Sequence, residues 1–408
     1  MMKHYLTSVL LTLLGSLYAY PAVLGIFEDA AFPAPTTQGN GIARFNEIDG
    51  ELYAPSANGI YKYTPTGATK WALFAMEGLN VLDFKVRGDE VIAIVAPKEL
   101  NNGINDHHLA RLYKAHVGSD GFQDITTDEM QYDYRDFKLT YLMRLAQNPN
   151  DSNEIMVATH AGVMRSKDFG GTWELLYDWC FSYNANQFLG WHPYMPGVMF
   201  YSSEGDFMNA LILRSGNDGE EWEIVEPAPY TGDNSAHHIA FDPTHHDHLL
   251  LSGEGRIWES DDAGETFSQI YENNEELGYA YTIMFNPKNA AEAYCVGCNS
   301  LQQSIAIFKS SDNGRNWDIL AKSGLFSNHH YWVSESFIFD NKIFIYTRNG
   351  ILTYDLNGGS GIDNVAAEEN QTSVRYYNLQ GVELPEEPQG PGVYIERRGD
   401  SSSLKARR

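Results

Sequence analysis

One eight-residue pattern occurs four times, as SKDFGGTW (166–173), SGNDGEEW (215–222), SDDAGETF (260–267) and SSDNGRNW (310–317). The first serines of these stretches lie 49, 45 and 50 residues apart. An apolar run precedes each stretch and another follows it, and an Asn-Pro, His-Pro or Asp-Pro pair ends a further apolar run upstream. A repeat of about 40–50 residues built from short strands and turns is typical of β-propeller blades.

The residues of the repeat suit a tight turn between two strands of one blade. The Asp or Asn side chain can accept hydrogen bonds from N–H groups of its own turn. The following Gly adopts backbone angles that a Cβ disfavours, and the final Trp or Phe packs between neighbouring sheets. The repeat is therefore predicted to be structural, and its residues are not expected in a ligand site.

Less regular units flank the four clear repeats. Residues 41–71 and 80–122 show the same alternation of strands and turns, and residues 333–356 supply three more strands before the pattern stops. These units predict an all-β fold, a seven-bladed β-propeller, with six or eight blades as alternatives. We expect the apolar segment 22–30 (AVLGIFEDA) to provide the fourth strand of the last blade and so close the ring.

The repeated stretches resemble the Asp-box, or BNR repeat, of sialidases, sortilin-type receptors, xyloglucanase-type hydrolases and photosystem assembly factors. The resemblance implies a propeller with Asp-box turns. It does not imply one function, because the box is structural in all of these families.

The charge balance of the 408-residue chain narrows the choice of partners. The chain contains 54 Asp and Glu against 28 Lys and Arg, a net charge of -26. Such a surface repels phosphates and anionic lipids, so nucleic acid is not expected as a partner. Three cysteines are too few for a disulfide scaffold, and Cys295 and Cys298 are expected to be buried in a strand. No cofactor is predicted, and the THHDH segment (244–248) is not expected to hold a metal.

Both ends of the chain carry segments outside the predicted propeller, which takes residues 20–356. Residues 1–19 have a Lys, an apolar run and small residues, the plan of a secretory signal peptide. No later apolar run is long enough for a membrane span. Residues 357–370 form a Gly-, Asn- and Glu-rich linker, and residues 371–408 are predicted to form a small C-terminal β module.

The last segment contains YYNLQG, PGVYIERRG and a basic end. It resembles the C-terminal sorting module of secreted Bacteroidetes proteins. The resemblance implies a type IX-like export machinery as a partner and a secreted or cell-surface location. The alternative is a β-hairpin cap on the propeller.

The order of the strands predicts which face of the propeller meets a ligand. With strands A to D counted outward from the axis, the Pro turns join A to B and the repeated turns join C to D, so both lie on one face. Ligands of related propellers bind around the axis on the opposite face, which holds the B–C loops and the loops into each A strand. Aromatic, His and Arg side chains there would suit a glycan or protein ligand. The ligand-binding candidates are His160, His237, His238, Arg256, Tyr279, Tyr281, His330, Trp332 and Arg348.

A glycoside hydrolase needs two carboxylates flanking the scissile bond. The catalytic candidates on the predicted face are Glu204, Asp206 and Glu254. A sialidase also needs an arginine cluster, for which Arg44 is one candidate, with Arg256 and Arg348. However, the segment IARFNE lacks the proline of the sialidase motif, and sialidases have six blades. Xyloglucanase-type enzymes use two propellers, more than this chain can hold.

The sequence thus favours a secreted, non-catalytic propeller that binds a glycan or protein ligand at its axial face. A purely structural envelope component is not separated from this by the sequence. A sialidase-like or xyloglucanase-like glycoside hydrolase is the alternative from a different class.

Overall fold

A computed structural model describes most of the chain. The described residues are 27–33, 43–67, 69–97, 109–134, 137–142, 144–159, 162–178, 188–203, 211–229, 235–299, 304–323, 333–347, 350–357, 374–377, 383–384, 392–398 and 401–407. The chain divides into two compact units, residues 1–360 and 361–408.

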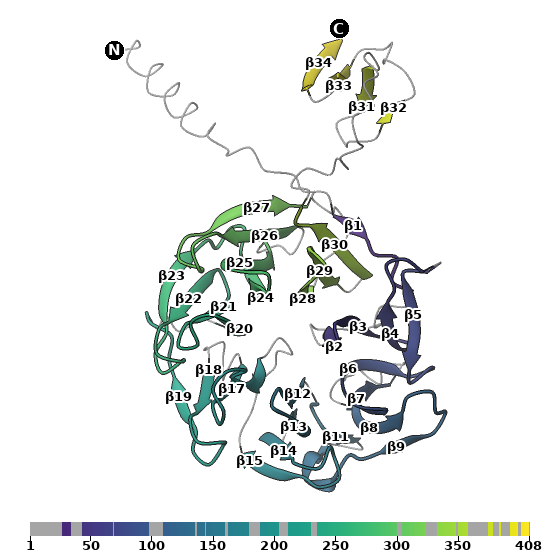
Figure 1. Cartoon of the computed structure of the whole chain (residues 1–408), viewed down its shortest axis with the longest axis vertical. Helices are drawn as coiled ribbons and strands as arrows, with labels where there is room; N and C mark the ends of the chain where they lie inside the picture. Colours follow the sequence, from purple (N-terminus) through teal and green to yellow (C-terminus); the bar gives the residue numbers. More distant parts are fainter. Residues whose placement is uncertain are drawn as a thin grey trace. The chain divides into compact units, whose positions relative to one another are not determined.

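The described residues of the first unit form seven four-stranded antiparallel sheets arranged around a central axis (Figure 1). We number these blades 1 to 7 along the chain and letter their strands A to D from the axis outward. The A strands are β2 (Asn46–Ile48), β6 (Asn80–Arg87), β12 (Arg144–Asn148), β16 (Leu189–Trp191), β20 (Ala236–Phe241), β24 (Tyr279–Asn286) and β28 (Val333–Phe339). The B strands are β3 (Glu51–Ser56), β7 (Glu90–Ala96), β13 (Asp151–Thr159), β17 (Met199–Ser203), β21 (Leu249–Gly253), β25 (Asn289–Cys298) and β29 (Lys342–Thr347).

The outer half of each blade completes the seven sheets that the repeat predicts. The C strands are β4 (Gly59–Tyr63), β8 (Arg111–His116), β14 (Gly162–Ser166), β18 (Leu211–Ser215), β22 (Arg256–Ser260), β26 (Ile305–Ser310) and β30 (Gly350–Asp355). The D strands are β5 (Trp71–Ala75), β9 (Phe122–Asp124), β15 (Glu174–Tyr177), β19 (Glu223–Val225), β23 (Ser268–Glu272), β27 (Asp318–Lys322) and, for blade 7, β1 (Glu28–Asp29). The prediction of a seven-bladed propeller is confirmed.

Blade 7 is completed by a strand from the other end of the propeller sequence, as predicted. Strand β1 pairs with β30 through Glu28↔Thr353 and Asp29↔Leu352. Close behind it, the ring of Phe32 packs against Trp71 of blade 1 and Tyr346 of blade 7. The segment therefore ties the first blade to the last and covers the outer edge of the sheet.

The four repeated turns share one set of hydrogen bonds. In the first, the N–H of Gly170 donates to Ser166 Oγ over 2.7 Å, and the N–H of Thr172 donates to Asp168 Oδ1 over 2.8 Å. The other three turns repeat both bonds. The side chains of each turn thus accept hydrogen bonds from the backbone N–H groups of that turn, which explains why the same residues recur from blade to blade.

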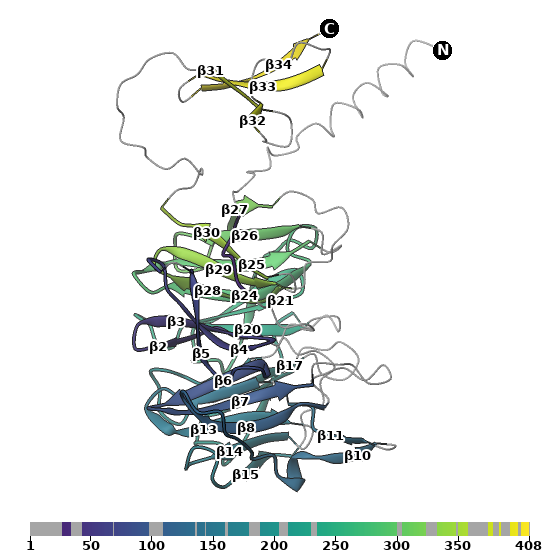
Figure 2. The ribbon, with the colours of Figure 1, turned by 90° about the vertical axis from the view of Figure 1, so that its right-hand side faces the viewer.

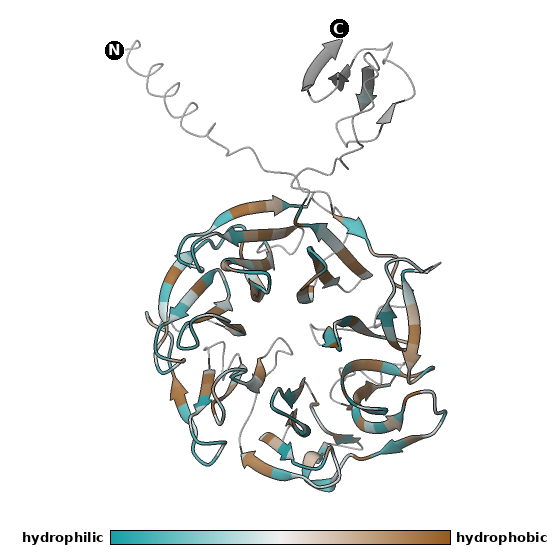
Figure 3. Cartoon of the chain, viewed as in Figure 1, coloured by the Kyte–Doolittle hydropathy of each residue, from teal (hydrophilic) through white to brown (hydrophobic). Residues whose placement is uncertain are grey.

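The cores lie between neighbouring blades. Phe200 of blade 4 packs with Leu249 and Trp258 of blade 5, for example. Cys295 and Cys298 are buried with free thiols on opposite faces of β25, and they join different interblade clusters. The hydrophobic residues, brown in Figure 3, accordingly lie mainly on the strands. Side chains alternate between the two faces of a strand, so each blade contributes to two interfaces.

The connection between blades 2 and 3 carries an extra hairpin, β10 (Tyr132–Tyr134) and β11 (Phe137–Leu139), which projects from one face (Figure 2). A short 3-10 turn, Asp128–Met130, precedes it. Within the described part of the chain, no helix has the length and apolar character that crossing a membrane requires.

The second unit contains one four-stranded sheet. Its strands are β31 (Val374–Tyr377), β32 (Glu383–Leu384), β33 (Gly392–Arg398) and β34 (Ser401–Arg407), in the order β32-β31-β33-β34. This agrees with the small β module expected after the linker.

Candidate functional site

The two faces of the propeller carry different connections. The A–B and C–D turns lie together, because the N–H of Asp218 donates to Gly197 O and that of Ala263 donates to Asp247 O, both over 2.8 Å. We call this side the turn face. The B–C loops and the connections into each A strand leave the opposite ends of the strands, and we call that side the loop face.

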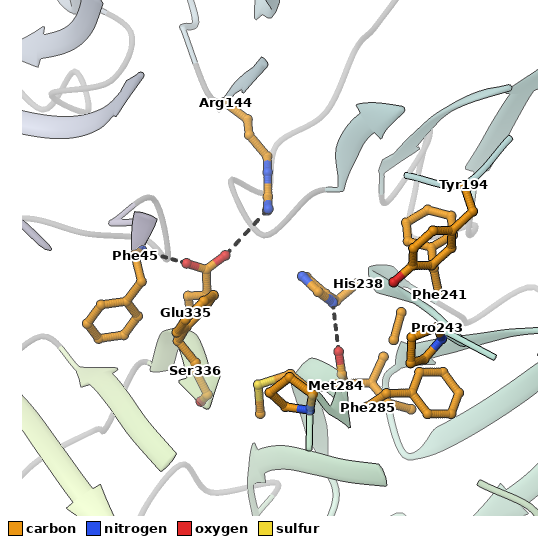
Figure 4. A pocket seen from close by; sticks show the side chains of 14 residues that line it. Phe45, Arg144, Tyr194, His238, Phe241, Pro243, Met284, Phe285, Glu335 and Ser336 are labelled. Carbon is orange, nitrogen blue, oxygen red and sulfur yellow. Dashed lines mark hydrogen bonds and ion pairs between the residues drawn. The ribbon is translucent and has the colours of Figure 1, made fainter. Parts of the chain in front are cut away.

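A cavity of about 470 Å³ lies among the inner strands of blades 3, 5, 6 and 7 (Figure 4). We call it the axial cavity. Nine of its fourteen described lining residues are apolar. The five polar ones are Arg144, Tyr194, His238, Glu335 and Ser336.

The axial cavity reaches the turn face. Tyr194, Pro243 and Pro287 line it, and all three belong to A–B turns. Tyr194 is 41% exposed there and stacks on His246 with ring centroids 4.4 Å apart. The sequence predicts a ligand on the loop face, whereas the axial cavity extends toward the turn face.

Charged side chains meet at the wall of the axial cavity, where Arg144 and Glu335 line it. Glu335 Oε1 lies 3.4 Å from Arg144 Nη2 and 3.8 Å from Arg44 Nε, and Glu335 Oε2 accepts the N–H of Phe45 over 2.6 Å. Arg44 and Glu335 are only 3% and 7% exposed. Figure 4 shows Arg144 and Glu335 pointing toward each other across the cavity. The side chains of Arg144 and Glu335 are largely shielded from water, so each charge relies on the other for stabilisation.

A second charged pair adjoins this cluster. Asp83 Oδ2 accepts the N–H of Leu145 over 2.8 Å, and Asp83 Oδ1 lies 3.7 Å from Lys85 Nζ. Lys85 lines a further cavity of about 350 Å³ that shares Arg144 with the axial cavity.

Together these described groups carry more basic than acidic side chains, although burial lowers the pKa of Lys85. Three basic side chains (Arg44, Lys85, Arg144) face two carboxylates (Asp83, Glu335), a formal sum of +1. Burial and then the charge of Arg144 lower the pKa of Arg44 to about 10, so Arg44 stays charged at neutral pH. Burial raises the pKa of Glu335, although Arg44 and Arg144 act in the opposite direction. A positive centre therefore sits inside a protein whose net charge is -26.

His238 lies beside this cluster in β20. Its Nδ1 is 3.0 Å from the carbonyl oxygen of Ile283. The edge of its ring meets Phe188 at a centroid distance of 5.6 Å, and the Arg144 guanidinium lies 5.6 Å from the centre of the same Phe188 ring. Burial, followed by the charges of Arg144 and Arg44, lowers the pKa of His238 well below its ordinary value. The ring is therefore neutral at neutral pH.

Three other predicted ligand-binding residues form a stack inside the propeller. The rings of His237 and Tyr281 are 5.6 Å apart, and those of Tyr281 and Tyr279 are 5.9 Å apart. His237 and Tyr281 are 1% and 3% exposed. The His237 Nδ1 contacts Ala280 O over 3.0 Å, and burial lowers the pKa of His237 to about 4.

Two further predicted residues, Glu254 and Arg256, lie at the connection between β21 and β22 on the loop face. Arg256 Nη2 is 3.5 Å from Glu272 Oε1, and Ser235 Oγ donates to Glu254 Oε1 over 3.4 Å. Six predicted site residues lie outside the described residues: His160, Glu204, Asp206, His330, Trp332 and Arg348.

Two histidines of the THHDH segment lie beside the carboxylate of Asp242 in the A–B turn of blade 5. His248 Nδ1 and His245 Nδ1 lie 3.1 and 3.4 Å from Asp242 Oδ2. Burial raises the pKa of Asp242, but hydrogen bonds from Thr244 and His248 outweigh this and hold that pKa far below its usual range. Within the described ranges, no group of three or more His, Cys, Asp or Glu side chains is arranged to hold a metal ion.

Of the residues that line the axial cavity, His238 was predicted from the sequence, and nearby Arg44 was predicted only as part of a sialidase arginine cluster. Arg144 and Glu335 were not predicted. The signal that could have found them is a charged residue within an inner strand, such as Glu335 in VSESFIF. Buried charges are rare unless they are paired, so such a residue calls for a partner near the axis.

Comparison with known proteins shows what this propeller resembles. A family model described as "Sortilin, neurotensin receptor 3" (Sortilin-Vps10) matches residues 210–356. No curated protein matches the chain. The fold is similar to the GH74 xyloglucanase from Xanthomonas campestris, with a TM-score of 0.56 and 15% identity over 92% of this chain and 60% of that one. The chain therefore spans about 60% of the length of that enzyme.

Two further solved structures are similar over nearly their whole length. YCF48 from Cyanidioschyzon merolae has a TM-score of 0.53 and 11% identity over 81% of this chain and 99% of that one. A YCF48 bound to D1 peptide has a TM-score of 0.51 and 14% identity over 84% of this chain and 97% of that one. At such identities the similarity concerns the fold. The described residues form a seven-bladed propeller whose fold is similar to that of these proteins, and residues 210–356 match the sortilin family model.

Proposed function

We propose that this protein is a non-catalytic binding propeller whose ligand places an acidic group at Arg144 in the axial cavity. The observation that carries the proposal is the cluster with excess basic side chains at the wall of a largely apolar cavity. A desolvated guanidinium attracts a carboxylate strongly and can bind it with directed hydrogen bonds. The hydroxyl of Ser336 also lines the cavity and, in the described part of the chain, has no hydrogen-bond partner.

The lining favours a peptide or protein ligand over a glycan. Nine of the fourteen described lining residues are apolar, so most hydroxyls of a sugar ring would lose water without gaining a partner. The net charge of -26 also repels acidic polysaccharides at a distance. A neutral or basic peptide with one acidic group avoids both costs. One solved YCF48 structure contains a D1 peptide, which provides a precedent for this fold.

Glycoside hydrolysis is the competing function. It needs two carboxylates near the scissile bond. Among the described residues that line the axial cavity, Glu335 is the sole carboxylate, and it is paired with two arginines. The candidates Glu204 and Asp206 lie outside the described residues, so the experiment below includes them.

We also propose that the protein acts outside the cytoplasm. The support is the signal-like pattern of residues 1–19 and the sorting-like segment 371–408. Expression in a bacterium with the matching export system, followed by mass determination of the mature protein, tests this. Retention in the cytoplasm with residues 1–19 intact would contradict it.

The binding test uses the propeller in its full chain. N-acetylated hexapeptides with free carboxyl ends, and the same library as carboxamides with and without internal Asp or Glu, are screened by fluorescence polarisation. We expect binding that requires an acidic group and falls at least tenfold in Arg144→Gln. The matched control is Arg165→Gln, because Arg165 is similarly buried and ion-paired but lines neither described cavity.

Three results would overturn the proposal. The first is an equal loss of binding in both arginine variants, and the second is no acid-dependent binding at all. The third is release of sugars from xyloglucan or mucin glycans that disappears in Glu204→Gln, Asp206→Asn or Glu254→Gln. This third result would establish the hydrolase.

A further inference from the structure

The tautomer of His238 follows from its surroundings. Nδ1 lies 3.0 Å from the main-chain carbonyl oxygen of Ile283. A carbonyl oxygen only accepts hydrogen bonds, so Nδ1 must carry the proton that is donated to it. In a ring with one proton, Nε2 is then a bare nitrogen that can only accept.

This acceptor belongs to the axial cavity. His238 lines the cavity, and the structure gives its Nε2 no hydrogen-bond partner among the described residues. Figure 4 shows the ring anchored on one side by the bond to Ile283, with its other side directed toward the space between Arg144 and Glu335. Phe188 holds the orientation of both recognition groups, because its ring contacts the His238 ring and the Arg144 guanidinium.

The cavity therefore offers two unlike features side by side, a cation that attracts an acid and a neutral acceptor that requires a donor. We propose that His238 is a specificity residue which selects an acidic group accompanied by a neighbouring N–H on the same ligand residue. The acid lies at Arg144, and the N–H donates to His238 Nε2. An ionised acid without such a donor can bind Arg144 but cannot donate to His238 Nε2.

This inference rests on the proposed function and refines its ligand class. In a peptide, the same chemistry has two sources. A chain-terminal carboxylate is adjacent to the N–H of its own residue, and an Asp side chain also lies close to its own N–H. Both sources present the acid and the donor within one residue, and the experiment separates them.

The test replaces a single N–H in the ligand. The tightest hexapeptide from the screen is synthesised with the amide N–H of its acid-bearing residue intact or replaced by an ester oxygen. One arm has a free carboxyl end and no Asp, and the other has an internal Asp and a carboxamide end. For the arm that binds, we expect the ester to bind about tenfold more weakly to the natural protein, equivalent to about 1.4 kcal/mol.

Two variants show whether His238 is responsible. In His238→Phe, which keeps a ring but lacks the acceptor, the amide and ester should bind equally. In His238→Gln, whose side-chain oxygen can accept, a preference for the amide should return. Each comparison is a ratio within one variant, so a general loss of stability or affinity cancels. Thermal unfolding verifies that both variants are folded at the assay temperature.

The outcomes distinguish this inference from the function on which it rests. Equal binding of amide and ester to the natural protein, with the dependence on Arg144 retained, refutes the role of His238 and leaves the acid site standing. A preference for the amide that persists unchanged in His238→Phe also refutes it. Loss of all acid-dependent binding refutes the proposed function itself.

Discussion

Replacing Gly264 with alanine tests whether the repeated turns hold neighbouring blades together. Gly264 lies in the repeated turn of blade 5 with a φ of +81°. A Cβ there would lie 2.5 Å from Phe200 Cε1 and 2.7 Å from Phe200 Cζ, in the B strand of blade 4. Phe200 is fully buried, so its ring has little room to move. The turn is therefore expected to fail through packing as well as through backbone conformation.

Two terms set the magnitude. An L-residue in the left-handed region costs about 1–2 kcal/mol, and overpacking a buried site costs about 1–3 kcal/mol. We expect the free energy of unfolding to fall by about 2–5 kcal/mol in Gly264→Ala. Gly78→Ala is the matched control, because Gly78 has a similar φ of +84° but no atom within 4 Å of the added Cβ. It should lose about 1–2 kcal/mol, from the backbone alone.

The assay is urea unfolding of the full chain, monitored by tryptophan fluorescence, for the natural protein and both variants. The difference between the two alanine variants isolates the contact with Phe200, since both substitutions have the same effect on the unfolded chain. Coincident unfolding midpoints for Gly264→Ala and Gly78→Ala would refute the packing argument.

Two further predictions concern closure of the ring and pH. Phe32→Ala removes a ring that is 8% exposed and packed on Trp71. We expect the free energy of unfolding to fall by about 3–5 kcal/mol, and oligomers to be detected by size-exclusion chromatography because β30 loses its cover. Leu175→Ala, on an outer strand, should have neither effect. For pH, burial lowers the pKa of His237 to about 4, below its value of about 6.5 in the unfolded chain. As the pH falls, the unfolded state binds the proton of His237 before the folded state does. The contribution of neutral His237 to stability is therefore fully present above about pH 6.5 and is lost as the pH falls toward 4, by at most about 3 kcal/mol. Urea midpoints at pH 7 and 4.5 should therefore differ less in His237→Gln than in the natural protein, and an equal difference would contradict the assignment.

Much of the fold followed from local chemistry. The spacing of the repeated turns predicted the blades, and those turns do satisfy their own backbone through Ser and Asp or Asn side chains within five residues. The apolar segment that includes β1 was recognised because the last unit lacked a strand. The turns are readable because they depend on residues that are neighbours in the chain, and the closing strand, which pairs Glu28 with Thr353, was inferred from the missing fourth strand of the last unit.

The candidate site depended on contacts that no local pattern contains. Phe45 and Glu335, which share a hydrogen bond beside Arg44, are 290 residues apart, and Glu335 is 191 residues from Arg144. His238 was predicted to face a ligand, but its role as an acceptor depends on a carbonyl oxygen 45 residues away. The sequence by itself predicted a propeller, with seven blades favoured over six or eight, and it determined the chemistry of the repeated turns, because each turn is set within one repeat. Only the tertiary structure decided which charges meet at the axis, because closing the ring brings together inner strands from blades that are distant in the chain.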